Sequence, residues 1–414
     1  MDSRSERAFL IVASSGRSLA ASARRAGCRA RVLDLFGDAD LDELEAVFAR
    51  VARGKSGGFD GDDLLKRADA LAPPSSQPPF GLVYGSGFED RPELLARLEP
   101  GRELFGNAPP VLARSKDPFA LAAIIDGLGL PRPEIARARP AGGGAWLIKR
   151  VGGAGGIHIR YAQKEKADDA APAAYYQRFV EGVPVSALVL AGGGTAMVLG
   201  LSEQWPAPGS LAQPFRFGGA AAPADLAASL SRRLTEAAIA VAQELNLIGL
   251  NSVDFIADVA RETFHVIEVN PRPGASLDVF ERILAEPLFD LHLRACRGEL
   301  PKAVARQNVA AASAILYADE PMRIDGNFEW PGWTADRPRA GTRIKAGEPV
   351  CTVLAEAHDG KRTTETPTAL AREIVEQRTE ALRTAIRQCM QTSFARDPAV
   401  KTPRDTGGNR RGPQ

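Results

Sequence analysis

Cysteine and histidine are scarce in this chain of 414 residues, with four of each. The cysteines are widely scattered and form no C-x-x-C pair, which argues against a zinc site and against a disulfide framework. The histidines are equally scattered, and no two of them stand as H-x-x-x-H. We therefore expect reduced thiols in a cytoplasmic protein, with no convincing Ser/His/Asp or Cys/His set for nucleophilic catalysis.

Long apolar runs and an excess of one charge are also missing. No run reaches the roughly 18 apolar residues that suggest a membrane-spanning helix. The apolar run at residues 8–13 is too short for the core of a signal peptide. The formal net charge is +1, which gives no sign of a nucleic-acid partner. We therefore expect neither a membrane nor a nucleic acid among its partners.

The N-terminal part follows a strand–helix–strand order. Residues 9–13 and 30–35 are predicted strands, with a helix at 17–26 between them. This order predicts a doubly wound parallel sheet, which a strand at 80–84 extends after a helix at 41–53. At 414 residues the chain exceeds one ordinary core, so two or three domains are expected.

Two short Gly/Ser loops follow predicted strands, at residues 14–18 and 85–88. Ligands of such sheets bind where strands end, but short turns usually only reverse the chain, so these are weak site candidates. The sequence Gly-Lys-Ser at 54–56 is not a phosphate-binding P-loop, because Ala49 stands where that motif needs glycine. Gly-Ser-Gly at 85–87 lacks the third glycine of a dinucleotide fingerprint, since Asp90 occupies that place.

Helices and strands alternate further along the chain. A helix is predicted to begin at the sequence Ser115-Lys116-Asp117-Pro118, with Ser115 or Asp117 near its cap. Other helices are predicted at residues 226–245, at 277–296 with a break at Pro287, and at 366–389, the last facing solvent. Strands are predicted at residues 146–149, 157–161, 175–180, 185–190 and 196–203, before a β-rich stretch at 311–355. Residues 396–414 are polar, basic and rich in Pro and Gly, which predicts disorder.

The most informative stretch is residues 254–274, DFIADVARETFHVIEVNPRPG. Two short apolar runs flank a polar turn, so a hairpin folded near Glu262 would place Asp254 opposite the segment from Glu268 to Asn270. Glu268 and Asn270 are two residues apart and point to one face of a strand. An E-x-N pair alone is usually just solvated. Three converging oxygen side chains instead indicate a site for Mg²⁺ or Mn²⁺.

Arg272 follows this hairpin between two prolines, Pro271 and Pro273. Because two prolines so close cannot both sit in a regular strand, they fix a rigid exit from the hairpin. The exit holds the guanidinium where it can meet an anionic group.

A glycine loop at residues 152–156 lies between two predicted strands. Backbone N–H groups of such a loop can approach phosphate oxygens without obstruction, although a plain flexible hairpin tip has the same composition. Lys149 precedes the loop and suits the α- and β-phosphates of a nucleotide. Taken alone, it could equally be an ordinary lysine on an exposed strand face.

Across residues 115–280 these features resemble the ATP-grasp superfamily in their order and rough spacing. The resemblance implies a metal site at Asp254, Glu268 and Asn270, and catalytic roles for Arg272 and Lys149. It implies ATP contacts by Lys116, Lys149, Gly153, Gly155, Gly156, Arg178, Val180 and Glu181. Arg178 and Val180 would offer backbone groups to adenine, and Glu181 would reach the ribose. The family often has Glu where Gln177 stands, which leaves a side-chain role there open.

Residues 9–38, and residues 333–354 with the run GTRIKAGEPVCTV, resemble the flanks of one ATP-grasp group. This group is the carboligases distantly related to biotin carboxylase, some of which are tyramine–glutamate ligases of methanofuran-type cofactor synthesis. The fold class expected is therefore α/β (α+β), with an N-terminal doubly wound domain, a nucleotide clamped between two α+β subdomains, and a β-rich C-terminal part. The expected boundaries are 1–114, 115–182 for the lid, 183–300 for the metal subdomain, 301–360, and 361–414.

The resemblance implies an ATP-dependent carboxylate–amine ligase that works through an acyl-phosphate, with ATP and Mg²⁺ (or Mn²⁺) as cofactors. Its partners would be a small-molecule carboxylate and an amine, with glutamate and tyramine as one pair. A carboxyphosphate-forming carboxylase and a non-catalytic nucleotide-binding protein remain alternatives. The carboxylase would need a partner, since no Met-Lys-Met biotin-carrier motif occurs here. Family members are often dimers, so a homodimer is one option.

Overall fold

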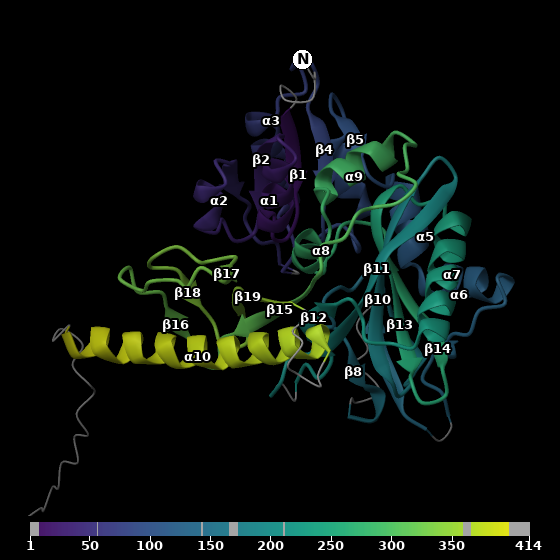
Figure 1. Cartoon of the computed structure of the whole chain (residues 1–414). Coiled ribbons are helices and arrows are strands. Elements are labelled where there is room, and N and C mark those ends of the chain that lie inside the picture. Colours follow the sequence, from purple (N-terminus) through teal and green to yellow (C-terminus); the bar gives the residue numbers. More distant parts are fainter. Residues whose placement is uncertain are drawn as a thin grey trace, which may run out of the picture.

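The computed structural model describes residues 8–55, 57–141, 144–164, 173–209, 212–358 and 366–396. Within these residues a parallel sheet, a four-stranded antiparallel sheet and an eight-stranded antiparallel sheet organise the chain (Figure 1). This mixed architecture confirms the expected α/β fold class. Within the same residues, no helix is both long and apolar enough to cross a bilayer.

The N-terminal sheet has the strand order β3-β2-β1-β4-β5, and all its pairs are parallel. The order reverses between β1 and β4, as in a doubly wound fold. The strands are β1 (Ala8–Val12), β2 (Arg29–Asp34), β3 (Val47–Arg50), β4 (Gly81–Tyr84) and β5 (Glu103–Phe105). The helices are α1 (Arg17–Arg25), α2 (Asp40–Glu43), α3 (Gly61–Leu71) and α4 (Pro92–Leu98).

The helix predicted at residues 41–53 is wrong. Helix α2 ends after one turn, Glu45 has a left-handed φ of 55°, and β3 follows. The apolar residues Val47 and Phe48 pair with β2, in register with Arg31 and Val32. Pairing along the edge of the sheet therefore overrides a helical sequence pattern.

The four-stranded sheet has the order β6-β9-β7-β8. Asp117 caps α6, because its side chain accepts from the backbone N–H groups of Phe119 and Ala120, as predicted. Ser115, the other candidate, lies inside α5. The strand predicted at 157–161 is shorter than expected, since only Arg160 and Tyr161 pair. The elements are α5 (Pro109–Lys116), α6 (Pro118–Gly127), β6 (Ile135–Ala136), β7 (Trp146–Arg150), β8 (Arg160–Tyr161), a 3₁₀ turn (Ala162–Lys164) and β9 (Ala174–Arg178).

The eight-stranded sheet has the order β14-β13-β10-β11-β12-β15-β19-β17, so residues before and after position 300 share one sheet. Its strands are β10 (Val183–Gly192), β11 (Thr195–Pro206), β12 (Phe217–Ala222), β13 (Gly249–Asp258), β14 (Thr263–Asn270), β15 (Val309–Tyr317), β17 (Thr334–Ala335) and β19 (Pro349–His358). A separate ribbon pairs β16 (Met322–Arg323) with β18 (Arg343–Ile344). The helices are α7 (Ala228–Glu244), α8 (Leu277–Ile283) and α9 (Leu288–Cys296), and the predicted break at Pro287 separates the last two.

The long C-terminal helix α10 (Pro367–Arg396) lies along the lower side of the view in Figure 1. It was expected to face solvent, but one of its faces is buried against β15 and β19. Ala371, Val375, Leu382 and Ile386 join the core there. The tail predicted to be disordered, apart from Arg396 at the end of α10, lies outside the described residues.

Candidate functional site

The hairpin of β13 and β14 places Asp254 directly opposite Glu268, and Ser252 opposite Asn270. This confirms the pairing predicted from the sequence. The register shifts between Asp254 and Phe255, which marks an irregularity beside the acid. Irregular pairing of this kind re-aims side chains at sites.

Polar contacts join the hairpin to two other elements. The Asn270 side chain donates to Asp254 Oδ2 at 2.8 Å, and the Ser186 hydroxyl of β10 donates to Asp254 Oδ1 at 2.6 Å. Lys116, the last residue of α5, donates to Asn270 Oδ1 at 2.7 Å and to Glu268 Oε1 at 3.2 Å. Lys116, Asp254, Glu268 and Asn270 therefore form one connected group.

The pKa values of Asp254 and Glu268 are shifted in opposite directions. Burial raises the pKa of Asp254 to about 6, and the neighbouring charge of Glu268 acts in the same direction. Burial also acts to raise the pKa of Glu268, but the charges of Lys116 and Lys149 outweigh it and hold that pKa below its ordinary value. Glu268 is therefore ionised at neutral pH. Such separation of two acids is typical of functional sites, although structural ion pairs also produce it.

Lys149 lies on β7 and is only 3% exposed. Its ammonium donates to the side-chain oxygen of Gln177 on β9 at 2.9 Å, so Gln177 orients this lysine. Burial lowers the pKa of Lys149, while the charge of Glu268 opposes that shift. The side-chain role left open for Gln177 is thus a structural contact with Lys149.

The glycine loop between β7 and β8 contacts residues far away in the sequence. A Cβ atom on Gly156, whose φ is +72°, would lie 1.8 Å from the carbonyl oxygen of Phe215. The carbonyl of Gly155 accepts from the N–H of Phe217 at 3.0 Å. Gly153 packs against His158, whose ring a Cβ would meet at 2.5 Å. Glycine is therefore required here by close approach as well as by conformation.

A cavity lies between α6, the glycine loop and β14. Lys116, Gly153, His158, Gln177 and Glu268 line its polar side, and apolar residues of α6 line the other. Burial lowers the pKa of His158 to about 4, so its imidazole is neutral at physiological pH. The cavity thus joins the lysine and acid group to the glycine loop.

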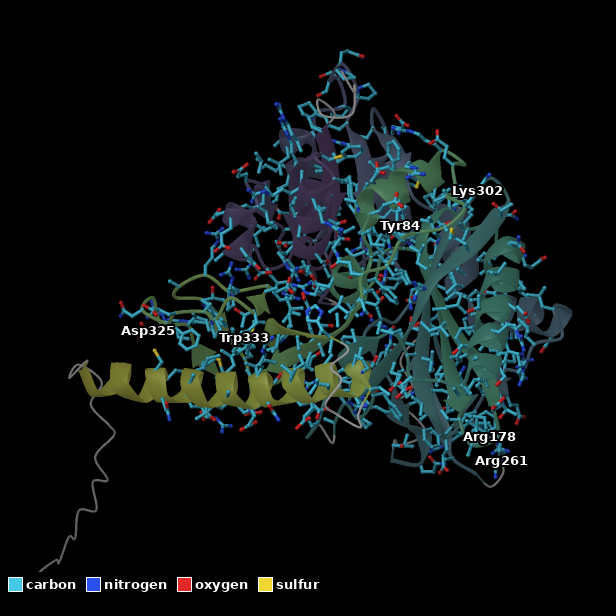
Figure 2. All side chains as sticks on the ribbon, viewed as in Figure 1. Tyr84, Arg178, Arg261, Lys302, Asp325 and Trp333 are labelled. Carbon is cyan, nitrogen blue, oxygen red and sulfur yellow. The ribbon has the colours of Figure 1, made fainter. Side chains whose placement is uncertain are left out.

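Three residues predicted to bind nucleotide, Arg178, Val180 and Glu181, are not among the residues that line this cavity. The Arg178 guanidinium lies 5.0 Å from the centre of the Trp146 ring, and Glu181 is exposed. Figure 2 shows Arg178 near the lower edge of the molecule, well separated from Tyr84. Gln177, which directly precedes Arg178, does line the cavity, and the nucleotide contacts expected of Arg178, Val180 and Glu181 stay predictions.

Arg272 is 8% exposed and is held by a residue that the sequence analysis missed. Its Nε and Nη2 atoms both lie 2.8 Å from Glu89 Oε1, and the other Glu89 oxygen accepts from the backbone N–H groups of Gly87 and Phe88. Burial acts to raise the pKa of Glu89, but the charges of Arg272 and Lys116 together with backbone N–H groups outweigh it and lower that pKa. The only sequence signal was that Glu89 follows a loop already noted as a weak candidate.

A buried polar network fixes the chain before Arg272. The Asn107 side chain donates to the carbonyl of Pro271 at 2.9 Å and to Asn251 Oδ1 at 2.7 Å. The Tyr84 hydroxyl lies 2.8 Å from the carbonyl of Asn107 and 3.3 Å from that of Pro271. Sequence patterns did not indicate these residues, because each contact joins distant parts of the chain.

The donor set of Asp254, Glu268 and Asn270 is chemically suited to a hard cation. Within the described residues, no three His, Cys, Asp or Glu side chains are arranged to hold a metal ion. Mg²⁺ commonly uses one or two carboxylates and completes its shell with water and phosphate oxygens. The two carboxylates and one amide therefore fit Mg²⁺ that is shared with a phosphorylated ligand.

The family model described as an ATP-grasp domain matches residues 116–276, which is the part of the chain that carries this site. Two curated relatives match part of the chain. The carbamoyl phosphate synthase large chain of Myxococcus xanthus is 28% identical over 234 residues, which are 50% of this chain and 21% of that protein. The mitochondrial methylcrotonoyl-CoA carboxylase subunit alpha of Rattus norvegicus is 32% identical over 127 residues, 28% of this chain and 17% of that protein. The chain spans about a fifth of the length of these relatives.

Solved structures share the fold over most of the chain. The biotin carboxylase domain of the Hydrogenobacter thermophilus 2-oxoglutarate carboxylase has a TM-score of 0.64 at 13% identity, covering 83% of this chain and 85% of that one. The N5-carboxyaminoimidazole ribonucleotide synthetase of Thermotoga maritima has a TM-score of 0.63 at 17% identity, covering 91% and 98%. Residues 116–276 thus match the ATP-grasp domain model, in a chain whose fold is similar to those of biotin carboxylase and of this synthetase.

Proposed function

We propose that this chain is an ATP-dependent ligase that joins a small-molecule carboxylate to an amine. The observation that carries the proposal is the convergence of Lys116, Asp254, Glu268 and Asn270 beside the glycine loop, with Arg272 next along the chain. A buried cluster of two carboxylates and cationic groups is the arrangement that phosphoryl transfer requires.

ATP is proposed to lie under the glycine loop, with its adenine toward the backbone of Arg178 and Val180 and its ribose toward Glu181. Its γ-phosphate would then lie toward Arg272. The separation of Arg178 from Tyr84, which contacts Pro271, supports this elongated placement (Figure 2). The Hydrogenobacter domain is described as a complex with MgADP, ADP and bicarbonate, which supports ATP and Mg²⁺, or Mn²⁺, as ligands here.

Asp254, Glu268 and Asn270 would hold the metal, and a bound Mg²⁺ would neutralise charge on the phosphates. Lys149 would contact the α- and β-phosphates beside Gly153, Gly155 and Gly156. Lys116 and Arg272 would contact the transferred phosphoryl group. These cationic side chains are already held in place by Glu268 and Glu89, so little rearrangement is needed when charge develops.

In the reaction proposed, a substrate carboxylate oxygen attacks the γ-phosphorus of ATP, and the bridging oxygen leaves with ADP. The amine then attacks the carbonyl carbon of the acyl-phosphate. Phosphate leaves with the oxygen that the carboxylate supplied, and the nitrogen loses a proton to give the amide. Each bond broken is matched by one formed, and no covalent bond to the protein is needed.

A carboxylase that forms carboxyphosphate from bicarbonate is the second candidate. This candidate is favoured by the similar proteins that are named as carboxylases. The ligase is preferred because the flanks of the chain resemble the carboligase group, some of whose members join glutamate to tyramine for methylofuran-type cofactors. That particular substrate pair is the most specific part of the proposal.

We also propose an oligomeric state and a cellular location. A homodimer is proposed because the Hydrogenobacter domain is described as a dimer. A cytoplasmic location is proposed from the thiols, because none of the four cysteines is joined in a disulfide. The five-part division of the chain at residues 114, 182, 300 and 360 stays a prediction.

The test is ADP release from Mg·ATP across a panel of carboxylates and amines that includes L-glutamate with tyramine, with mass analysis of the products. The ligase predicts ADP only when an acid and an amine are both present, and a product with the mass of their amide. ADP formed with bicarbonate alone would establish the carboxylase instead. No turnover with any pair, despite tight Mg·ATP binding, would favour a binding protein.

A further inference from the structure

A second cavity lies at the carboxyl ends of β1 and β4, where the strand order of the parallel sheet reverses. It is lined by the two Gly/Ser loops that the sequence analysis ranked as weak candidates, through Ser15, Ser18 and Ser86. Ligands of open α/β sheets bind in the crevice at such a reversal. The cavity therefore lies where such sheets typically bind their ligands.

This cavity begins at the proposed phosphoryl-transfer site. Arg272 lines one part of it, and the chain continues from there through Pro273 and Gly274 into its wall. The Arg272 guanidinium also lies 3.5 Å from Asn270 Oδ1, within the proposed metal group. A molecule in the cavity would therefore reach a carboxyl group activated beside Arg272.

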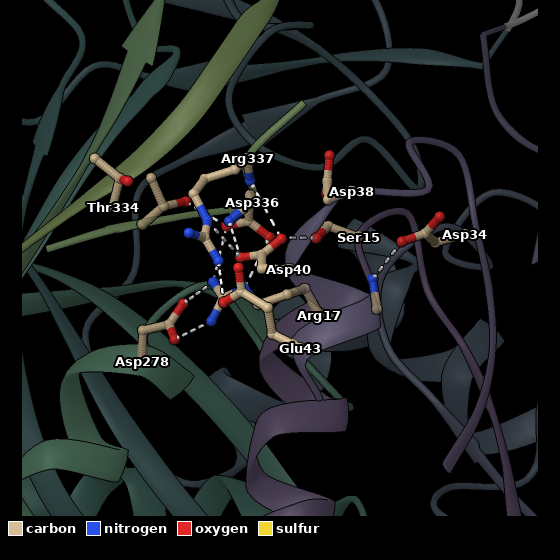
Figure 3. Close-up of polar contacts among 12 residues, drawn as sticks. Ser15, Arg17, Asp34, Asp38, Asp40, Glu43, Asp278, Thr334, Asp336 and Arg337 are labelled. Carbon is tan, nitrogen blue, oxygen red and sulfur yellow. Dashed lines mark hydrogen bonds and ion pairs between the residues drawn. The ribbon is translucent and has the colours of Figure 1, made fainter. Parts of the chain in front are cut away.

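The other part of the cavity is lined by an arginine held between two aspartates (Figure 3). The guanidinium of Arg17 donates to both oxygens of Asp278 at 2.6 Å and to Asp336 at 2.8 and 3.1 Å. Asp336 also accepts from the hydroxyls of Ser15 at 2.8 Å and Thr352 at 2.5 Å. These bonds fix both carboxylates at the wall.

The wall presents carboxylate rather than guanidinium to the cavity. The Arg17 side chain is 6% exposed, whereas those of Asp278 and Asp336 are 12% and 20% exposed. Behind them, Asp40 lies 3.8 Å from Arg17 and 3.9 Å from Arg337. Arg282 also lies 3.9 Å from Asp278, while Glu356 contacts Arg282 and Glu43 contacts Arg337. Five carboxylates are thus joined to three guanidinium groups, which leaves an excess of negative charge. A carboxylate oxygen with one hydrogen bond can accept another from an ammonium group.

Apolar side chains complete the cavity between its two polar parts. Ala13, Leu19, Phe217, Leu277 and Ile315 line it together with the small polar residues. Mostly apolar walls with a few placed polar groups are typical of small-molecule sites. The chemistry fits a ligand with an apolar body and one cationic end.

We propose that this cavity binds the amine substrate as an organic ammonium ion with an apolar body. Asp278, whose oxygens each accept one hydrogen bond from Arg17, accepts another from the ammonium, and Asp336 adds negative charge beside it. This inference rests on the proposed ligase function, because it assigns the second substrate of that reaction. The ammonium gives one proton to solvent before its nitrogen attacks the carbonyl carbon of the acyl-phosphate beside Arg272. Phosphate leaves, and the nitrogen gives a second proton to solvent as the amide forms.

The test is a calorimetric titration of the whole chain with MgADP present. The probes are tyramine, phenethylamine and putrescine, each compared with the alcohol and the carboxylate of the same skeleton. At least one amine should bind about tenfold or more tightly than its alcohol. The isosteric change Asp278→Asn should abolish that preference. Ser18→Leu, which fills the cavity without removing a charge, should abolish binding of every probe.

Glu281→Gln is the matched control, because Glu281 lies on the same helix and contacts α1 through Ser22 and Arg25 without lining the cavity. It should keep the preference for the amine. The inference is overturned if alcohols or carboxylates bind as tightly as amines, if no probe binds, or if Glu281→Gln acts like Asp278→Asn. Carboxylate-dependent scrambling of the bridging oxygen of ATP in the wild type, which needs no amine, tests the ligase proposal separately.

Discussion

Lys116 is the residue on which the polar contacts of the acid group converge. Its ammonium contacts both Glu268 and Asn270, which lie more than 150 residues later in the chain. Its charge contributes to the low pKa of Glu268. The local sequence made Lys116 a candidate only through the order of motifs, and its partners depend on how α5 packs against β14.

At Glu268, the change Glu268→Gln should lower turnover of Mg·ATP by at least about 100-fold, because an amide cannot replace the charge that faces Lys116 and the metal. Circular dichroism should show an intact fold. Glu299→Gln, at an exposed position, is the control and should keep full activity. Full activity of the Glu268 variant would remove this residue from the metal site.

The change Glu89→Ala should remove the ion-pair partner of Arg272, in a site where both side chains are less than a tenth exposed. Breaking one side of such a buried pair costs about 3–5 kcal/mol of unfolding free energy, which urea denaturation measures. The exposed pair of Asp258 and Arg261 offers a control, since Asp258→Asn should leave the unfolding midpoint unchanged. A loss below about 1 kcal/mol for Glu89→Ala would mean that the pair behaves as a surface contact.

At the scale of elements, the periodicity of the sequence predicted the β13–β14 hairpin, β1, α1 and the C-terminal β-rich part. These elements are specified by their own residues, through alternating apolar positions and turn-forming residues. The helix predicted at residues 41–53 was wrong because the apolar spacing there suits a helix, whereas part of the stretch pairs with the edge of β2 as β3. Packing against β2 determines the structure there, and local periodicity does not reveal such a tertiary contact.

His292 joins three elements through a neutral imidazole. Its Nδ1 accepts from the N–H of Leu250 on β13, so its Nε2 carries the proton and donates to the carbonyl of Phe105 on β5. Burial lowers its pKa from 6.5 to about 4. Because the unfolded chain binds this proton more readily, the stability contribution is full above pH 6.5 and is lost as the pH falls to 4.

The expected loss from this group is roughly 3 kcal/mol between pH 7 and pH 4, which urea unfolding at a series of pH values measures. In His292→Gln that component of the pH dependence should be absent. If wild type and variant lose stability in parallel over this range, His292 is not the group responsible.

A substitution at Gly156 tests whether the close approach of the glycine loop to Phe215 shapes the nucleotide site. Gly156→Ala would force the carbonyl of Phe215 away, so it should raise the KM for ATP by about tenfold and also lower stability more than strain at φ alone would. Gly129→Ala carries similar strain, with φ of +66°, but meets no atom within 4 Å. An equal KM for ATP in both variants would mean that the contact with Phe215 does not shape the nucleotide site.

At the scale of the whole molecule, the site depends on contacts between parts that no local pattern connects. Glu89 and Arg272 are 183 residues apart, and Arg17 and Asp336 are 319 apart. The sequence could supply the fold class and the acid–lysine set by resemblance to a family. It could not supply Glu89, Asn107 or the second cavity, because these arise only when the parallel sheet docks on the eight-stranded sheet.

The most direct test of the central claim uses a carboxylate substrate labelled with ¹⁸O in both carboxyl oxygens. After turnover with Mg·ATP and amine, the mass of the released phosphate is measured. An acyl-phosphate predicts one ¹⁸O in each phosphate and one in the amide, because the carboxylate oxygen that attacked phosphorus leaves with it. Phosphate free of label, with amide formed, would contradict the mechanism proposed for this site.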